Sequence, residues 1–218
     1  MNLKLLLEPG DKLLRATFKE DLETVVKSLR SVIEKYGIVA ATKSGTEGLL
    51  KTLGKFKSLK DYNAVYFVQA SEIRGTRGQG FLAVVSVNST IIHTGSKYQR
   101  KEALTEWEFI GIAKLSTDFG QVYMRPELLH DKINEYFSPL EIDFDFDKEF
   151  SKKYFVLTTD EAKLRERVTQ NFLSAIRKHR GLEIEIQGKD MLIRLKKRVS
   201  TESAETITEL LYDLTKKE

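Results

Sequence analysis

Four acidic side chains alternate with apolar ones between positions 140 and 147, and such an arrangement could hold a divalent cation. The four are Glu141, Asp143, Asp145 and Asp147. Carboxylates two residues apart on a strand share a face, and their oxygens are the ligands that Mg²⁺ and Ca²⁺ prefer. A calcium loop, however, continues with glycine and carries glutamate at its twelfth position, where this chain has Lys148 and Tyr154. We therefore predict no metal site and interpret the stripe as a solvated strand face that discourages edge pairing.

Two groups of basic residues could contact phosphate or another anion. Arg74 and Arg77 belong to a loop with three glycines, but phosphate loops need a helix N-terminus behind them. This loop is predicted between two strands, so a hairpin turn is the favoured interpretation. The second group follows a predicted strand and is the densest basic cluster, for which a solvated strand end is the simpler interpretation: Arg194, Lys196, Lys197 and Arg198. These six are the predicted binding residues.

The remaining candidates for chemistry are weaker. Gly45-Thr46-Glu47-Gly48 superficially matches a loop that clamps RNA, but a glutamate would repel phosphate, so the start of a helix is favoured. The three histidines, His93, His130 and His179, are far apart and form no metal or nucleophile–base pattern, which favours surface or boundary positions. No serine lies in a nucleophile elbow. We predict no catalytic residue and no cofactor.

Composition limits the classes of function. The chain has 218 residues, 36 basic and 32 acidic, with a net charge of +4, so it leans only slightly toward anionic partners. The absence of cysteine excludes disulfides and Cys-ligated metals. The apolar run at the N-terminus, Leu3 to Leu7, is too short for a signal peptide or a membrane span. We expect a cytoplasmic protein.

The elements that must position these residues begin with two helices. Phe18 to Tyr36 repeats apolar residues at helical spacing, with a buried face of Val25, Val26, Leu29 and Ile33, and a shorter helix covers Thr46 to Phe56. Strands follow and should form an antiparallel meander, and Pro126 should open another helix. The predicted strands are Ala64–Ala70, Phe81–Val87 and Thr90–His93 joined by a turn at Asn88-Ser89, Trp107–Leu115, and Gln121–Met124.

The last third reads β-α-β-β-α. A strand at Tyr154–Leu157 precedes a long helix from Thr158 to His179, whose buried face includes Leu164, Val168, Phe172 and Ile176. Leu182–Ile186 and Met191–Leu195 then form a hairpin, and a final helix starts at Thr201. The predicted fold class is therefore α+β, with an N-terminal helical unit, an antiparallel meander and a C-terminal β-α-β-β-α module. The predicted domains are 1–138 and 139–218, or one continuous domain.

Three short segments carry a resemblance to a known family. Tyr123-Met124-Arg125-Pro126, the segment 147–156 and Asp160-Glu161 before a long helix resemble a bacterial family of uncharacterised proteins, a domain of unknown function. Many of its members place a cytoplasmic domain behind one or two N-terminal transmembrane helices. The similarity covers about residues 62–218 and departs at the N-terminus, where this chain predicts soluble helices. The resemblance implies no known activity, but it does imply a bacterial cytoplasmic origin and work near the membrane.

Three function classes remain open. The leading hypothesis is a non-catalytic cytoplasmic binding or regulatory module whose partner is a protein, because no catalytic pattern outweighs its structural interpretation. The alternative is a protein that binds nucleic acid or an anionic surface such as a membrane, supported by a pI near 9 and the two basic groups. The third is an enzyme with an unrecognised carboxylate site. A structure separates these classes by showing whether the basic residues converge.

Overall fold

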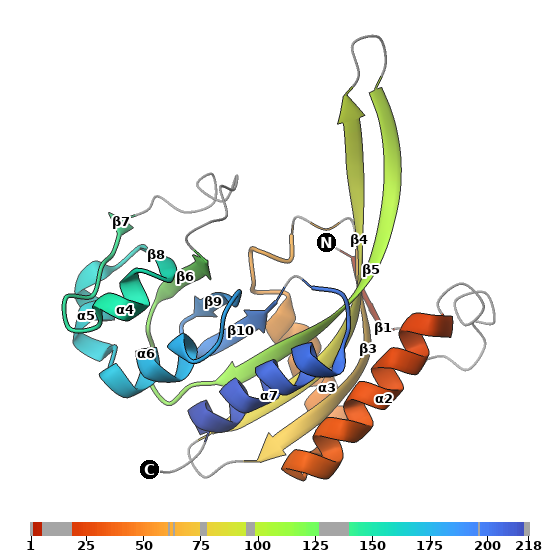
Figure 1. The fold of residues 1–218 in the computed structure, drawn as a ribbon, viewed down its shortest axis with the longest axis horizontal. Helices are drawn as coiled ribbons and strands as arrows, with labels where there is room; N and C mark the ends of the chain where they lie inside the picture. The colour runs from red at the N-terminus through yellow and green to blue at the C-terminus, as the bar shows by residue number, and fades with distance from the viewer. Residues whose placement is uncertain are drawn as a thin grey trace.

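The computed structural model describes residues 2–5, 19–60, 62, 64–74, 78–94, 99–126, 140–195 and 197–215. Over these residues the chain has the predicted α+β class, with helices packed on one largely antiparallel sheet of ten strands (Figure 1). The strands are β1 Asn2–Leu5, β2 Val39–Ala40, β3 Ala64–Arg74, β4 Gln79–Thr94, β5 Gln99–Lys114, β6 Gln121–Pro126, β7 Leu140–Glu141, β8 Tyr154–Thr158, β9 Glu183–Gln187 and β10 Asp190–Arg194.

The strand order is β1-β3-β4-β5-β10-β9-β6-β8-β7, and β2 pairs with β3. The predicted meander is present in β3-β4-β5 but does not continue to β6. Instead the predicted C-terminal hairpin, β9–β10, lies between β5 and β6 and pairs antiparallel with both. Strands from both sides of position 138 therefore belong to one sheet.

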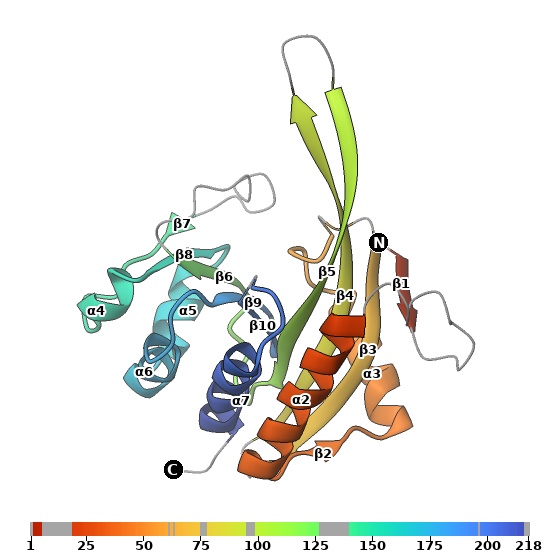
Figure 2. The ribbon, with the colours of Figure 1, turned by 45° about the vertical axis from the view of Figure 1, so that its right-hand side comes forward.

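Helices cover both faces of this sheet. Their bounds are α2 Lys19–Tyr36, α3 Lys43–Leu53, α4 Lys148–Ser151, α5 Glu161–Arg167, α6 Gln170–Arg177 and α7 Thr201–Thr215. Figures 1 and 2 show α2 and α7 on one face and α3 on the opposite face. Helix α7 lies directly on β5, because a Cβ at Gly111 would come within 2.7 Å of Ile207 Cγ2. Among the described residues, no helix is both long and apolar enough to cross a membrane.

The first two predicted helices differ in detail from those in the structure. Helix α2 buries Val25, Leu29 and Val32, whereas Val26 and Ile33 are 50% and 39% exposed, because the 3.6-residue period turns them away from the sheet. Helix α3 starts three residues earlier than predicted: Thr42 caps it by accepting a hydrogen bond from the Gly45 N–H at 3.2 Å. Gly45 to Gly48 is thus the start of a helix, as predicted.

The predicted turn at Asn88-Ser89 is wrong. Both residues lie inside β4, opposite Thr105 and Leu104 of β5, and the pairing of the two strands is continuous from Gln79 to Thr94. The turn propensity of asparagine and serine is overridden by cross-strand pairing and by the β-branched residues on both sides. The predicted helix after Pro126 lies outside the described residues.

The predicted long helix from Thr158 to His179 is two helices, α5 and α6. Val168 is extended (ψ 126°), and Thr169 starts a new helix by accepting the Phe172 N–H at 3.2 Å. Phe172 is only partly buried, stacked 5.0 Å from Phe119, and Leu173 is buried in its place. The break rotates the second helix, so one apolar stripe no longer describes both.

The acidic stretch is a strand only at Leu140–Glu141. The alternation of buried and exposed residues then reverses, because Phe146 is 50% exposed and Asp147 is buried. Asp147 starts α4 by accepting the Phe150 N–H at 3.0 Å, and it pairs with Arg177 at 2.8 Å. A capping carboxylate therefore occupies the position predicted for a solvated strand residue.

Candidate functional site

The structure separates the six predicted binding residues. The side chain of Arg194 is 1% exposed, so the solvated strand end is wrong for this residue. Lys197 and Arg198, which follow β10, are exposed as predicted. Arg74 ends β3, but its side chain lies outside the description, as do Arg77 and Lys196. The described members therefore include one core residue and two surface residues, and no common basic site is formed by them.

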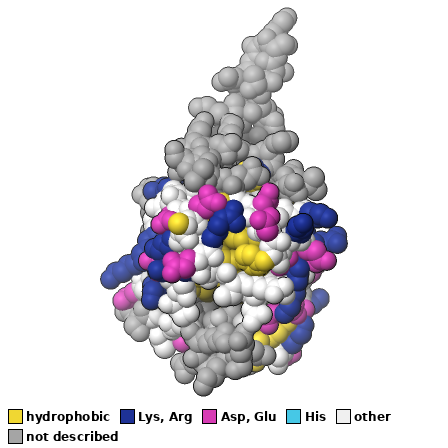
Figure 3. All heavy atoms as spheres, turned by 90° about the vertical axis from the view of Figure 1, so that its left-hand side faces the viewer, with side chains coloured by type: hydrophobic (Ala, Val, Ile, Leu, Met, Phe, Trp, Pro, Cys, Tyr) yellow, Lys and Arg dark blue, Asp and Glu magenta, His cyan; other side chains and the backbone are white. Residues whose placement is uncertain are grey.

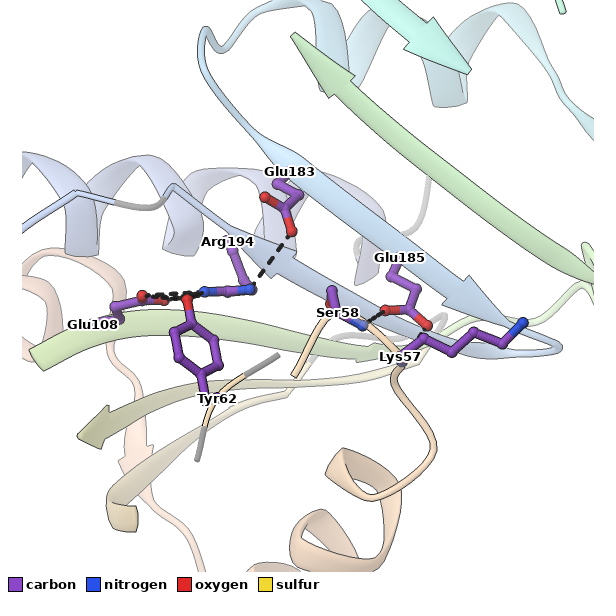
Figure 4. A network of polar contacts seen from close by, with 7 residues as sticks. All are labelled: Lys57, Ser58, Tyr62, Glu108, Glu183, Glu185 and Arg194. Atoms are coloured by element: carbon purple, nitrogen blue, oxygen red, sulfur yellow. Dashed lines mark hydrogen bonds and ion pairs between the residues drawn. The ribbon is translucent and has the colours of Figure 1, made fainter. Parts of the chain in front are cut away.

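Arg194 is the centre of a buried charged cluster, drawn in Figure 4. From β10 its Nε and Nη2 donate to Glu108 Oε2 on β5 at 3.2 and 2.9 Å. Its Nη1 lies 3.5 Å from Glu183 Oε1 on β9, and its Nη2 donates to the Tyr62 hydroxyl. We call these four residues the charged core. Both carboxylate side chains are less than a tenth exposed.

The electrostatics of the charged core keep Arg194 ionised. Burial alone would lower the pKa of its guanidinium, but the charge of Glu108 above all outweighs this effect and raises it. Burial raises the pKa of the Tyr62 phenol, although Arg194 acts in the opposite sense, so Tyr62 stays a neutral hydroxyl at physiological pH. A buried cation with two carboxylates is a fixed structural unit rather than a surface for an anion.

The segment that follows α3 packs over the charged core on this face of the sheet. Glu185 on β9 accepts the Lys57 N–H at 2.7 Å and the Ser58 N–H at 2.8 Å. Phe56 and Leu59 of the same segment are fully buried. One carboxylate thus satisfies two backbone donors of a turn that is not paired in the sheet, and residues 54–60 with Tyr62 cover the charged core.

Arg125 on β6 is a further buried charged side chain on this face of the sheet. It is buried beside β8, with its guanidinium 4.8 Å from the centre of the Phe155 ring. Within the described part of the chain, neither its Nε nor its Nη1 has a hydrogen-bond partner. Buried charged side chains on the α3 side of the sheet therefore extend from β5 through β10 and β9 to β6.

On the same face, an open cleft of about 550 Å³ lies between α3 and the sheet, and it shares β5 and β10 with the charged core. We call it the α3 cleft. Its lining comes from one helix and four strands: Thr42, Gly45, Gly48, Leu49, Thr52, Glu72, Gln79, Phe81, Ile112, Ala113, Lys114 and Asp190. Because these elements are far apart in the chain, only the folded sheet assembles this site.

Asp190 fixes one end of the cleft. Its carboxylate accepts from Lys55 at 2.5 Å and from Lys114 at 2.7 Å, and it is 7% exposed while the two lysine side chains are more than half exposed. Burial acts to raise the pKa of Asp190, but the hydrogen bonds from the two lysines outweigh it and hold the pKa below its ordinary value. This end therefore carries a net positive charge that solvent reaches.

Glu72 stands at the other end, where Gln79 Nε2 donates to its Oε1 at 2.9 Å. Phe81 and Leu49 form part of an apolar lining between the two ends. No sequence pattern predicts Glu72 or Asp190 as site residues, because their place in one cleft depends on strand pairing. The single local signal was the pair of glycines in α3, which the sequence favours only as a helix start.

The described carboxylates of the acidic stripe differ in burial, because Asp143 and Asp145 are exposed and Asp147 is buried. Asp143 and Asp145 line a second hollow of about 410 Å³, whose described lining residues lie between positions 142 and 156. Figure 3 shows the end of the molecule that carries α4, α5 and β8, where a small hydrophobic patch lies among side chains of both charges. Among the described residues, no three His, Asp or Glu side chains gather as metal ligands would.

His179 occupies a boundary position, as predicted. It is half-buried after α6, and burial lowers the pKa of its imidazole. His93 belongs to β4, with its side chain outside the description, and His130 is outside it altogether. Comparison with protein-family models, curated proteins and solved structures found no match to this chain.

Proposed function

We propose that this chain is a non-catalytic cytoplasmic binding module that recognises an extended, acidic segment of a partner protein. The observation that carries the proposal is a two-stranded arm, which we define as residues 89–94 of β4 and 99–105 of β5. Figure 1 shows the arm continuing beyond the rest of the sheet. The resemblance to proteins with membrane anchors adds a place near the membrane to the same proposal.

The arm offers strand edges for pairing. β4 and β5 stay in register from Gln79 opposite Lys114 to Thr94 opposite Gln99. The outer partner of β4 pairs no further than Asn88, and β10 pairs with β5 no further than Ile110, so the described strands leave the outer edges of the arm open. Open backbone N–H and C=O groups are what an added strand binds.

The basic residues in the sequence around β4 favour an acidic partner. From position 73 to position 101 the chain has no aspartate or glutamate, but it has five basic residues: Arg74, Arg77, Lys97, Arg100 and Lys101. Arg100 and Lys101 lie on the β5 strand of the arm, which also carries Glu102, and Lys97 lies in the sequence between the two strands, in a protein whose net charge is only +4. Electrostatic complementarity therefore selects acidic strands over basic ones and raises their association rate.

The proposal is tested by shortening the arm. Residues 90–103 are replaced by an asparagine–glycine turn, so that Ser89 and Leu104, which already face each other, flank a two-residue hairpin. The probe is a short peptide of alternating glutamate and valine, titrated by fluorescence anisotropy at physiological salt. We expect saturable binding to the full chain and at least about tenfold weaker binding to the shortened one, with an unchanged unfolding midpoint.

Three controls make this result specific. A peptide with alternate backbone nitrogens methylated cannot pair as a strand and should not bind. A lysine–valine peptide should bind at least about tenfold more weakly than the acidic one. Serine at Lys97, Arg100 and Lys101 should weaken binding and remove most of its salt dependence. Equal binding by the full and shortened chains would exclude the arm as the binding element.

The same basic residues favour nucleic acid as the second candidate function. A random single-stranded oligonucleotide and anionic vesicles are therefore titrated in parallel. Affinity that comes from counterion release falls steeply with salt. Sub-micromolar nucleic-acid binding that survives at about 200 mM salt would replace the protein partner with nucleic acid.

A further inference from the structure

Two ammonium groups meet at one end of the α3 cleft and share one carboxylate. Lys55, which follows α3, donates to Asp190 Oδ2 at 2.5 Å, and Lys114 on β5 donates to Asp190 Oδ1 at 2.7 Å. Among the described residues, Asp190 is the only ion-pair partner of either lysine. An ammonium group has three N–H donors, so two further donors on each lysine stay available to a ligand.

The geometry and the charge of this lysine pair suit a second carboxylate. Each ammonium already lies at hydrogen-bond distance from a different oxygen of Asp190, so the spacing of the pair also fits the two oxygens of another carboxylate that arrives from solvent. The lysine side chains are 53% and 56% exposed, whereas Asp190 is 7% exposed. Two positive charges and one negative charge leave a net charge of +1, which one carboxylate neutralises. A phosphate dianion would leave excess negative charge beside Asp190.

The wall that α3 gives to the cleft leaves room for an apolar body. Gly48 lies inside the helix without a positive φ, and a Cβ built on it would meet no atom within 4 Å. Glycine in a helix interior weakens the helix relative to alanine, so the bare position has a cost to the fold. Gly45 lines the same cleft one turn earlier, and Leu49 and Phe81 add apolar lining. A ligand with an apolar part therefore finds both space and contact beside the helix.

We propose that the α3 cleft binds a small monocarboxylic acid with an apolar body. Its carboxylate bridges Lys55 and Lys114, and its apolar body lies along α3 in contact with Leu49 and Phe81. Glu72, which lines the cleft on β3, is not needed as a ligand group. The volume of about 550 Å³ is in the range of small-molecule sites. This site is on a different part of the sheet from the arm, so the chain with the shortened arm should bind the acid as well as the full chain does.

The test is a titration with hexanoate followed by two-dimensional NMR of the ¹⁵N-labelled chain. We expect saturable shifts of the backbone amide signals of Gly48, Leu49 and Lys114. Hexanamide and hexylamine, which keep the apolar body but lack the negative charge, should bind at least about tenfold more weakly. Butyrate keeps the charge but loses two methylene groups, and it should bind at least about fourfold more weakly than hexanoate because it buries less apolar surface.

Variants separate the two parts of the site. Lys114→Gln, and independently Lys55→Gln, should remove most of the preference for hexanoate over hexanamide. Gly48→Leu fills the space beside the helix and should weaken hexanoate at least about tenfold without lowering the unfolding midpoint. Lys51 is exposed on α3 outside the cleft lining and gives both controls. Lys51→Gln removes the same charge, Lys51→Leu adds the same side chain, and both should bind hexanoate normally.

Three outcomes would overturn the proposal. Hexanamide that binds as tightly as hexanoate would show that the lysine pair does not select a carboxylate. Equal losses in the Lys51 and Lys114 variants, or no saturable binding at all, would exclude the α3 cleft as the site. Binding of N-acetyl-leucylleucine at least about tenfold tighter than that of hexanoate would replace the small acid with the C-terminus of a protein.

Discussion

Two parts of the α3 side of the sheet are built from the same chemistry and differ in what covers them. Both use β10: Arg194 at its end belongs to the charged core, and Asp190 at its start belongs to the α3 cleft. Each joins acidic and basic side chains through short contacts. Residues 54–60 and Tyr62 cover the first and leave Arg194 1% exposed, whereas the lysines of the second are more than half exposed.

This difference shows that burial under a covering segment decides whether an ion pair can still bind a further ion. A guanidinium enclosed with two carboxylates has given up its hydration and has no room for another anion, so it fixes the position of β10 between its neighbours. Lysines that hold one buried carboxylate keep free donors toward solvent, and they can receive a second anion without unfolding anything. Residue type alone does not distinguish these two outcomes.

The most direct test of this difference is to remove the enclosed cation, Arg194. Arg194→Met leaves Glu108 and Glu183 buried without their counter-charge, which costs about 3–5 kcal/mol of the free energy of unfolding. Urea unfolding measures it. A loss this large is a substantial part of the 5–15 kcal/mol of a typical domain, so the variant is compared at low temperature.

Arg198→Met is the matched control, because Arg198 is exposed just beyond the same strand. It should change stability by no more than about 0.5 kcal/mol. Adding Glu108→Gln and Glu183→Gln to Arg194→Met should recover part of the loss, because the unpaired charges are then gone. Equal losses in Arg194→Met and Arg198→Met would show that Arg194 is not enclosed.

The sequence predicted the fold better than the site, and Arg194 shows the reason. Local patterns identified α7, the β9–β10 hairpin and the helix α2 with half of its predicted buried face, because these depend on periodicity and turns. The burial of Arg194 depends on Tyr62 and Glu108, which are 132 and 86 positions away in the chain. A basic run at a strand end looks solvated until the segment that covers it is placed.

Local signals also failed where tertiary contacts overrode them. Asn88 and Ser89 have turn propensity, but continuous pairing with β5 holds them extended. Asp147 continued an alternating pattern, but its contact with Arg177 of α6 and its role as a cap bury it. No local sequence pattern predicts the position of the β9–β10 hairpin between β5 and β6. The α3 cleft depends on this position, because it places Asp190 beside Lys114.

The exposed ion pairs give the next prediction, which is about pH. The pKa of Asp190 in the folded chain lies below its ordinary value of 3.8, so the unfolded chain binds more protons near pH 4. The contribution of Asp190 to stability is therefore complete above about pH 4 and is lost as the pH falls through the lower, folded pKa. Asp190→Asn should cost about 1–2 kcal/mol at neutral pH, less than the enclosed pair.

Urea unfolding between pH 7 and pH 2 checks this sign. The difference between the natural chain and Asp190→Asn should shrink as the pH falls below 4, while the loss in Arg194→Met at neutral pH stays the larger of the two. If the difference persists undiminished at pH 2, the carboxylate form of Asp190 is not what stabilises this end of the cleft.

The smallest expected effect is a gain in stability rather than a loss, and it concerns Gly48 in the α3 cleft. Gly48 is in a helix interior, exposed, without a positive φ and without an atom within 4 Å of its missing Cβ. Alanine there removes conformational freedom from the unfolded chain and adds no clash, so Gly48→Ala should stabilise the protein by about 0.4–1 kcal/mol. Thermal unfolding measures the gain. Gly111→Ala is the contrasting variant, since its Cβ would come within 2.7 Å of Ile207, and it should destabilise. A loss of stability in Gly48→Ala would mean that the fold itself needs this glycine, and the open cleft would then be a by-product of helix packing.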